Sequence, residues 1–430
     1  MIRGIIHLVL VIAALPACYF QPFAGLLIYL WFAHAHVDSF VFDEFRYISG
    51  SGFLLAMATI AGYIFFEMRY SHPRLRGMKL LLAFWAWLLI SSLFASDREL
   101  ALSKLWQYSS IFVMAFLVAA LANSEGRIRK VFFALSVSLA MIGTKSALLY
   151  LFVAGHQVQA PGGMVSEENE YALALDLTIP ILYWLARTEH RLWLRCLLYL
   201  MSVGCGITAI ATGSRSGFLG LCVTLILIAV YADRKIVGIS GLVLAAALIL
   251  TLASGRILER YKTILQTEEF DQSVKGRLEA WETAVSVMKS HPFFGVGLRN
   301  FESEFAQYSN YHPLAAHNAL LSLAAETGLP GVALFALVIW GASFRMFWLR
   351  WLLPDTAENA ALRTYCLILH CDFLIFVVPN LFNTRQDYDL CYHLVGLAAG
   401  VGYVCEKRLF AAPLTSFIGN ADNMDVAAVR

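Results

Sequence analysis

Apolar runs of roughly 20 residues recur along this chain and constrain its fold more than any other feature. A bilayer core about 30 Å thick takes up roughly 20 apolar residues in each helical crossing. Hydrophobic residues make up 59% of the 430 residues and charged residues only 14%, against roughly 25% charged in soluble domains. A soluble fold cannot bury that many apolar side chains, so the pattern predicts an all-α polytopic integral membrane protein.

Counting the apolar runs gives the number of helices. The first stretch, residues 4–33, is interrupted by Pro16 and Pro22, so one kinked crossing and two short segments are both compatible with it. Eleven further runs lie at about 48–67, 78–95, 105–122, 131–154, 171–186, 194–212, 215–231, 236–253, 318–345, 362–381 and 388–405. With the first stretch counted as one crossing, we expect about 12 transmembrane helices.

The charges in the loops predict the orientation. Basic side chains are concentrated in every second loop, and the positive-inside rule assigns such loops to the cytoplasm. These side chains are Arg69, Arg74, Arg76, Lys79, Arg127, Arg129, Lys130, Arg187, Arg191, Arg195, Arg234, Lys235, Lys407 and Arg408. The alternate loops are acidic or mixed and are expected to face outward, with both termini in the cytoplasm.

The outward segment over residues 254–316 is far longer than a connection requires, which is typical of functional loops or of loops with their own helices. A helical pattern begins at Gly276 and is stopped by His291 and Pro292. Its expected apolar face consists of Leu278, Trp281, Val285 and Met288. The domain prediction is N-terminal transmembrane helices over 1–253, a large outer loop over 254–316, C-terminal transmembrane helices over 317–405, and a disordered cytoplasmic tail over 406–430.

Charged residues at membrane depth are costly, so each is a functional candidate until a partner explains it. Arg215 lies in a small polar break, Thr212–Gly217, between two apolar runs. The glycines and serines leave room for a ligand, and arginine binds phosphate through two parallel hydrogen bonds. We therefore predict that Arg215 binds an anionic head group. A tight turn with one interfacial arginine is the structural alternative.

His317 stands where the long loop re-enters the membrane, and an imidazole can accept a proton near neutral pH. A packed or capping histidine is the alternative. The segment Glu326–Gly331 follows and predicts a polar kink in an apolar helix. Weaker candidates are Lys145, Arg277, Arg299, Arg385 and the acidic Glu167, Glu168, Glu170 and Asp176.

Nucleic acid binding is disfavoured because 32 Lys and Arg are balanced by 30 Asp and Glu. No metal site and no cofactor are expected, since the cysteines and histidines lack metal-ligand spacing. Asp43 and Glu44 could bind a divalent metal or act as a base, but two adjacent carboxylates are a weak signal.

Four blocks in this order resemble the bacterial O-antigen ligase and polymerase superfamily over roughly residues 165–345. They are Thr212–Gly220, Gly276–Trp281, His291–Gly297 and His317–Gly331. Asn169 and Glu170, which precede these blocks, are similar to the subgroup of O-glycosylation ligases.

The resemblance implies a GT-C-like glycosyltransferase of the bacterial inner membrane with its active site facing the periplasm. Such ligases transfer a glycan from undecaprenyl diphosphate to lipid A-core, with inversion and without nucleotide sugar or metal. The family's essential arginine and histidine match Arg215 and His317, and a family loop arginine matches Arg277. By charge and position we add Arg299, Lys145, Arg385 and Glu168 as substrate-binding residues.

Four alternatives stay open. An O-antigen polymerase would use a second lipid-linked repeat as acceptor, and a protein O-oligosaccharyltransferase would use Ser or Thr. The latter often carries an added C-terminal outer domain, so the short tail favours a ligase. A metal-dependent transferase would use Asp43 and Glu44. A transporter or flippase would explain Lys145 and Asp176, but the sequence has no inverted repeat and its polar residues crowd on one side.

Overall fold

A computed structural model describes residues 2–35, 50–69, 75–153, 157–161, 167–232 and 267–411, and within these ranges the chain is helical with no strand. The helices are α1 (Ile2–Phe20), α2 (Pro22–His34), α3 (Ser51–Gly62), α4 (Leu75–Leu93), α5 (Arg98–Leu121), α6 (Glu125–Phe152), α7 (Glu168–Thr188), α8 (Leu192–Ala211), α9 (Arg215–Tyr231), α12 (Thr267–Ser290), α13 (Phe301–Glu304), α14 (Ala319–Leu352), α15 (Ala360–Asn380) and α16 (Asp389–Ala411). A π-helical turn, Tyr63–Glu67, extends α3, and a 3-10 turn, Phe305–Gln307, extends α13.

Five of these helices, α5, α6, α8, α14 and α15, are long and apolar enough to cross a membrane. Shorter apolar helices lie in α1, α2, α3 with its π-turn, α4 and α9. Large apolar side chains such as Trp106, Phe152 and Trp351 point outward from the bundle and are 71%, 79% and 69% exposed. An apolar outer surface on apolar helices indicates a multi-pass membrane protein.

The first apolar stretch does not form the single crossing used in the count of 12. The chain breaks at Gln21, where φ is −131° and ψ is 76°, and Pro22 begins α2. Helix α2 folds back on α1, so that the rings of His7 and Phe32 lie 5.9 Å apart. Gly25 allows the close approach, because a Cβ there would come within 2.6 Å of the Cα of Cys18. The start of α1 therefore lies at the same end of the bundle as His34, and not at the end where α16 finishes.

The other end of the bundle is held by ion pairs between the predicted cytoplasmic loops. Arg129 pairs with Glu189 at 2.6 Å, and Arg127 pairs with Glu67. Similar pairs are Arg345–Glu406 at 2.8 Å and Arg408–Glu125 at 3.6 Å. The basic loops assigned to one side from sequence are thus neighbours in space. Helix α16 continues to Ala411, past the predicted boundary at residue 405.

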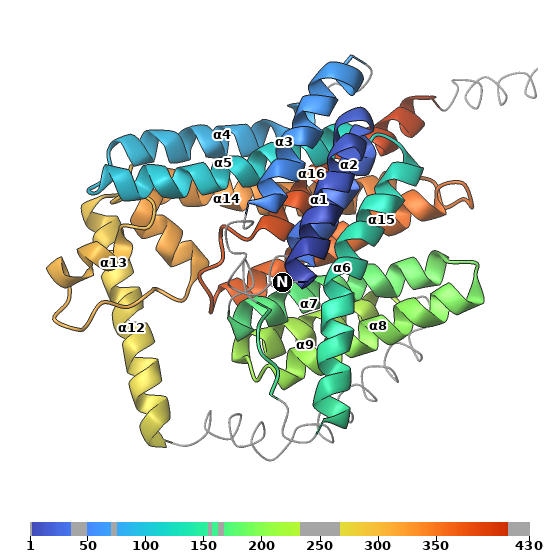
Figure 1. Ribbon diagram of the computed structural model, residues 1–430. Helices are drawn as coiled ribbons and strands as arrows, with labels where there is room; N and C mark the ends of the chain where they lie inside the picture. The colour runs from blue at the N-terminus through green and yellow to red at the C-terminus, as the bar shows by residue number, and fades with distance from the viewer. Residues whose placement is uncertain are drawn as a thin grey trace, which may run out of the picture.

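The opposite end, which we name the outer end, carries the starts of α5, α7, α9, α14 and α16. Part of the long loop lies here as α12 and α13, and Figure 1 shows α13 and one end of α12 near the turn that joins α4 to α5. Helix α12 ends at Ser290, as predicted from His291 and Pro292. The predicted run 236–253, the first part of the long loop and the tail after residue 411 lie outside the described residues.

The chain after α12 is clamped between α4 and a break in α14. Gly328 has φ 71° and ψ −179°, which confirms the predicted kink in the apolar helix. The freed carbonyls of Ala325 and Glu326 accept hydrogen bonds from Val296 N at 3.0 Å and Gly297 N at 2.8 Å. A Cβ on Gly328 would lie 2.1 Å from a main-chain oxygen of the loop, so only glycine allows this approach. The loop is therefore fixed to the membrane helices by backbone hydrogen bonds.

Candidate functional site

Arg215 is the first residue of α9, and its position is set by the turn before it. Gly213 has φ 69°, and the Ser214 hydroxyl accepts the N–H of Gly217 at 3.0 Å. Ser214 also donates to Asn169 Oδ1 at 2.6 Å, which joins the start of α9 to the start of α7. Serine is a preferred N-cap because its oxygen satisfies a free amide of the first turn. The Arg215 side chain, half-buried, is presented at the outer end.

The start of α7 is organised by two acidic residues. Glu167 and Glu170 form a reciprocal capping box, in which the Glu170 carboxylate accepts the N–H of Glu167 at 3.3 Å. Glu170 is fully buried and forms an ion pair with Arg385 from the loop before α16. The main-chain N–H of Arg385 donates to Asn380 Oδ1 at 3.1 Å. These contacts tie α7 to the last outer loop.

Arg277 on α12 is half-buried and lies within the electric field of Arg215. Burial lowers the pKa of Arg277, and the positive charge of Arg215 lowers it further. Both effects destabilise the charged form of a guanidinium. A negatively charged ligand near the two side chains would relieve this repulsion.

His317 lies between α12 and the start of α14 in a left-handed backbone conformation with φ 46°. Trp281 on α12 donates to the carbonyl of Ala316 at 2.9 Å, and Asn318 caps α14 by accepting two N–H groups at 3.0 Å. Few residues other than glycine adopt a positive φ, and the strain is tolerated where the surroundings fix it. The backbone at His317 is therefore fixed by contacts of the residues on either side of it.

The charges around His317 favour its neutral form. Burial lowers the pKa of His317 below its usual 6.5 and the charge of Arg277 lowers it further, while Glu167 and Glu302 oppose the shift. The lowered pKa favours the neutral imidazole. A neutral imidazole beside a cationic surface can remove a proton from a hydroxyl while the cations hold an anion.

A second polar group, formed by Lys104, Asp387 and Glu326, lies beside the kink of α14. Lys104 on α5 pairs with Asp387 at 2.5 Å, and Asp387 precedes α16. Both act electrostatically on the buried Glu326, whose carboxyl also receives the main-chain N–H of Arg299. Arg299 has φ 63° and an exposed side chain. These contacts connect the long loop to α5 and α16.

The structure brings together Arg215, Arg277 and His317, and it does not bring every predicted residue to them. Lys145 on α6 and Glu168 on α7 are exposed and are not among the groups that shift the pKa of His317 or Arg277. Asp43 and Glu44 lie outside the described residues.

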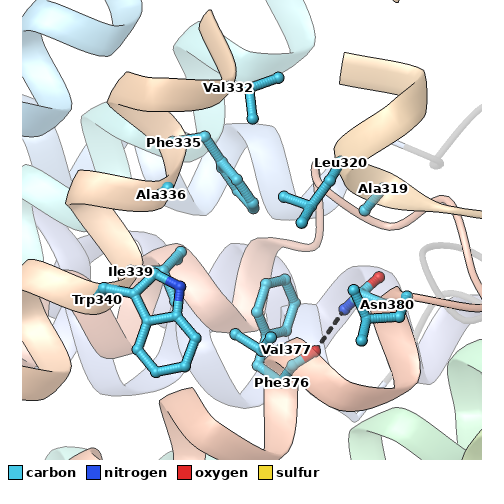
Figure 2. Close-up of a pocket in the computed structure, with 11 residues that line it drawn as sticks. Ala319, Leu320, Val332, Phe335, Ala336, Ile339, Trp340, Phe376, Val377 and Asn380 are labelled. Atoms are coloured by element: carbon cyan, nitrogen blue, oxygen red, sulfur yellow. Dashed lines mark hydrogen bonds between the residues drawn. The ribbon is translucent and has the colours of Figure 1, made fainter. Parts of the chain in front are cut away.

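An apolar cavity of about 90 Å³ opens between α14 and α15, and its lining includes Ala319 and Leu320, which follow His317 closely in the chain. Figure 2 shows Leu320, Val332 and Phe335 directed into it from α14, opposite Phe376 on α15. Asn380 is the polar residue at its edge and donates to the carbonyl of Phe376 at 2.9 Å. The remaining lining residues are Ala319, Ala336, Ile339, Trp340, Val377 and Leu381. An apolar chain attached to an anion at the site would find a matching surface here.

Sequence reasoning named Glu170 and Asn169 without giving either a contact, and it did not consider Glu302. The spacing of Glu167 and Glu170 is a capping-box signal, and α7 begins at this pair, just before the predicted apolar run 171–186. Nothing local connects Glu170 with Arg385, because the pair forms only through the fold. Glu302 is likewise brought to His317 by the loop that follows α12.

This geometry agrees with a comparison against protein families. Residues 200–336 match the family model described as O-Antigen ligase. The match supports membership of the O-antigen ligase superfamily. It begins within α8, includes Arg215, Arg277 and His317, and ends within α14 after the kink. No curated protein matches the chain.

Proposed function

We propose that the chain is an O-antigen ligase of the bacterial inner membrane. It would transfer a glycan from undecaprenyl diphosphate to the lipid A-core oligosaccharide on the periplasmic side. One observation carries the proposal: Arg215, Arg277 and His317, which come from three separate segments, interact electrostatically at one end of an apolar bundle. The family match over the same residues supports it.

In the proposed reaction, an acceptor hydroxyl attacks the anomeric carbon of the donor glycan. The bond from that carbon to the phosphate oxygen breaks as the new glycosidic bond forms, so a single displacement inverts the configuration. The hydroxyl proton passes to the neutral imidazole of His317. Undecaprenyl diphosphate leaves with the bonding electrons, and its added negative charge is stabilised by Arg215 and Arg277.

The remaining predicted residues are assigned to other parts of the donor and to the support of the site. An apolar segment of the donor's polyprenyl chain would lie in the cavity between α14 and α15, whose lining includes Ala319 and Leu320 shortly after His317. Arg385 would hold the start of α7 through Glu170 and contact the diphosphate with its exposed edge. The exposed side chains of Arg299, Lys145 and Glu168 are assigned to the glycan.

The proposal is tested with purified protein in lipid nanodiscs, given undecaprenyl diphosphate glycan and lipid A-core. We expect His317→Ala to lower the transfer rate by about 10²–10⁴-fold, the usual contribution of a general base. Arg215→Ala should lower it by about 10²–10³-fold, as for loss of one charge-stabilising donor. Matched controls are His190→Ala and Arg191→Ala, which remove exposed side chains at the opposite end. Transfer by His317→Ala at the wild-type rate would show that His317 is not the base.

The same assay separates the related activities. Longer glycans formed from the lipid-linked repeat alone would identify a polymerase, and transfer to Ser or Thr of a peptide would identify a protein O-oligosaccharyltransferase. Loss of transfer in chelator together with loss in Asp43→Asn would favour the metal-dependent alternative. Transport without any glycan product would favour a flippase.

A further inference from the structure

Three metal-binding side chains form a cluster that the transfer reaction does not use. His34 is the last residue of α2, Asp389 is the first residue of α16, and His393 follows one turn later. All three are buried, with exposed fractions of 2%, 7% and 0%. One nitrogen of each imidazole and one carboxylate oxygen lie within 4.8 Å of one another.

The spacing of these atoms suits a single metal ion. Asp389 and His393 are four residues apart, so their side chains share one face of α16. His34 Nε2 and His393 Nδ1 are hydrogen-bonded at 3.1 Å, and a bound ion would replace this hydrogen bond. Ligand atoms at about 2.1 Å from a tetrahedral zinc ion are roughly 3.4 Å apart, so the two nitrogens need to separate by only about 0.3 Å. The carboxylate oxygen can approach by rotation of the Asp389 side chain.

The chemistry of the three ligands selects the kind of ion. Two imidazole nitrogens and one carboxylate oxygen are a common ligand set for zinc, whereas magnesium and calcium prefer oxygen ligands alone. Because the cluster is buried, two protonated imidazoles at this distance would repel each other without water to screen them. Neutral imidazoles and a carboxylate offer a divalent cation three ligands with only one negative charge.

We propose that His34, Asp389 and His393 bind one Zn²⁺ ion that ties the N-terminal helices to α16. Helix α2 packs mainly on α1, α3 and α6, while α16 packs mainly on α4, α5, α14 and α15, and α6 contacts both α2 and α16. The ion bridges these two groups of helices at the outer end. It lies just after the loop with Arg385 and Asp387 and stabilises the start of α16. It takes no part in the transfer reaction, so failure of either proposal leaves the other standing.

The test uses the full-length protein with a tag free of histidine, purified in detergent and treated with chelator. Zinc is added back, bound metal is measured by elemental analysis after gel filtration, and thermal unfolding is followed with and without zinc. We expect one zinc per chain and a higher Tm with zinc. His34→Ala should lose the bound zinc and its effect on Tm, and Asp389→Asn should weaken zinc binding about tenfold or more.

The matched control is His370→Ala, which removes a half-buried imidazole from α15 that bonds to Ser343 and, among the residues that the structure describes, belongs to no such cluster. This variant should keep the zinc and its effect on Tm. A wild-type protein that binds no stoichiometric zinc would overturn the proposal, whether or not the variants fold. Equal zinc content in wild type and His34→Ala would overturn it as well. Stoichiometric binding of manganese or iron in place of zinc would overturn the choice of ion.

Discussion

The ion pair between Glu170 and Arg385 joins α7 to the last outer loop, and its removal has two distinguishable effects. The Glu170 side chain is 0% exposed and the Arg385 side chain is 24% exposed. Breaking a buried pair costs about 3–5 kcal/mol, because one charge stays buried without its partner. The cost should depend on which partner is removed.

Glu170→Gln keeps the shape of the side chain and an acceptor for the capping box. The charge that it leaves unpaired belongs to Arg385, which can turn toward water, so we expect destabilisation near the lower limit of about 3 kcal/mol. Arg385→Gln leaves a carboxylate fully buried, so the upper limit of about 5 kcal/mol applies. A loss of about 3 kcal/mol in the free energy of unfolding, relative to wild type, lowers the folding equilibrium constant roughly 100-fold.

The assay measures unfolding in mixed micelles as the fraction of a denaturing detergent is raised. Unfolding is detected by the fluorescence of the 10 tryptophans. The double variant replaces the ion pair by two amides and should be more stable than Arg385→Gln alone. Glu168→Gln is the matched control, because it removes an exposed charge from the same turn of α7 and should change stability by less than about 0.5 kcal/mol. Equal effects of Glu170→Gln and Glu168→Gln, or additive effects in the double variant, would refute the reasoning.

Four other predictions concern the site and the kink. Because Arg277 lowers the pKa of His317, Arg277→Gln should shift the acid limb of the pH–rate profile to higher pH, and an unchanged limb would mean that another base acts. Gly328→Ala combines a positive φ with overlap against a main-chain oxygen, so it should lower the free energy of unfolding by roughly 2–6 kcal/mol in the same micelle assay. Without donor, Arg215→Gln should be as stable as wild type or more stable by about 0.3–1 kcal/mol, since a cation opposes the dipole at a helix start; a large loss would indicate a structural role. Lys145→Met should raise KM for the glycan donor with little change in kcat, and unchanged kinetics would remove Lys145 from the substrate site.

The helices were predictable because each has to satisfy its backbone groups within a membrane. Length and hydrophobicity therefore identified the long helices such as α5, α6 and α15 without knowledge of their neighbours. The kink at Gly328 was also readable, since glycine and Pro330 interrupt an apolar run at that point. In both cases the controlling interaction is local in sequence.

Packing faces were less predictable. On α12 the apolar pattern placed Leu278 on the apolar face, and in the structure Leu278 is 49% exposed while Ala280 and Ala284 are fully buried. Small residues allow α12 to approach Ala316 and Ala325 closely, so contact is decided by the shape of the partner and not by the size of the apolar side chain. The apolar face read from the sequence is therefore not the face of α12 that packs most closely in the fold.

The candidate site was predicted only in part, because some of its residues stand out in the local sequence and others gain a role only through contacts between distant segments. Arg215 and His317 stand out because each is polar beside a long apolar run. Their acidic neighbours Glu167 and Glu302 gain a role only when α7 and the long loop meet, and ordinary acidic residues at helix starts give no sign of it. The buried ligands on α2 and α16 are separated by most of the chain and were missed for that reason.

The position of Arg215 explains why a site for anions would form at this end of the bundle. Helices α5, α7, α9, α14 and α16 all begin here, and each helix start carries roughly half a positive charge. At the opposite end, arginines such as Arg129 are paired with carboxylates. Arg215 instead stands at the start of α9, where the dipole disfavours a cation, and it lowers the pKa of Arg277 beside it. Such an arrangement costs stability in the free protein. A diphosphate bound between the two arginines would relieve their repulsion. The free energy released in this way would add to the affinity of the site for the anion.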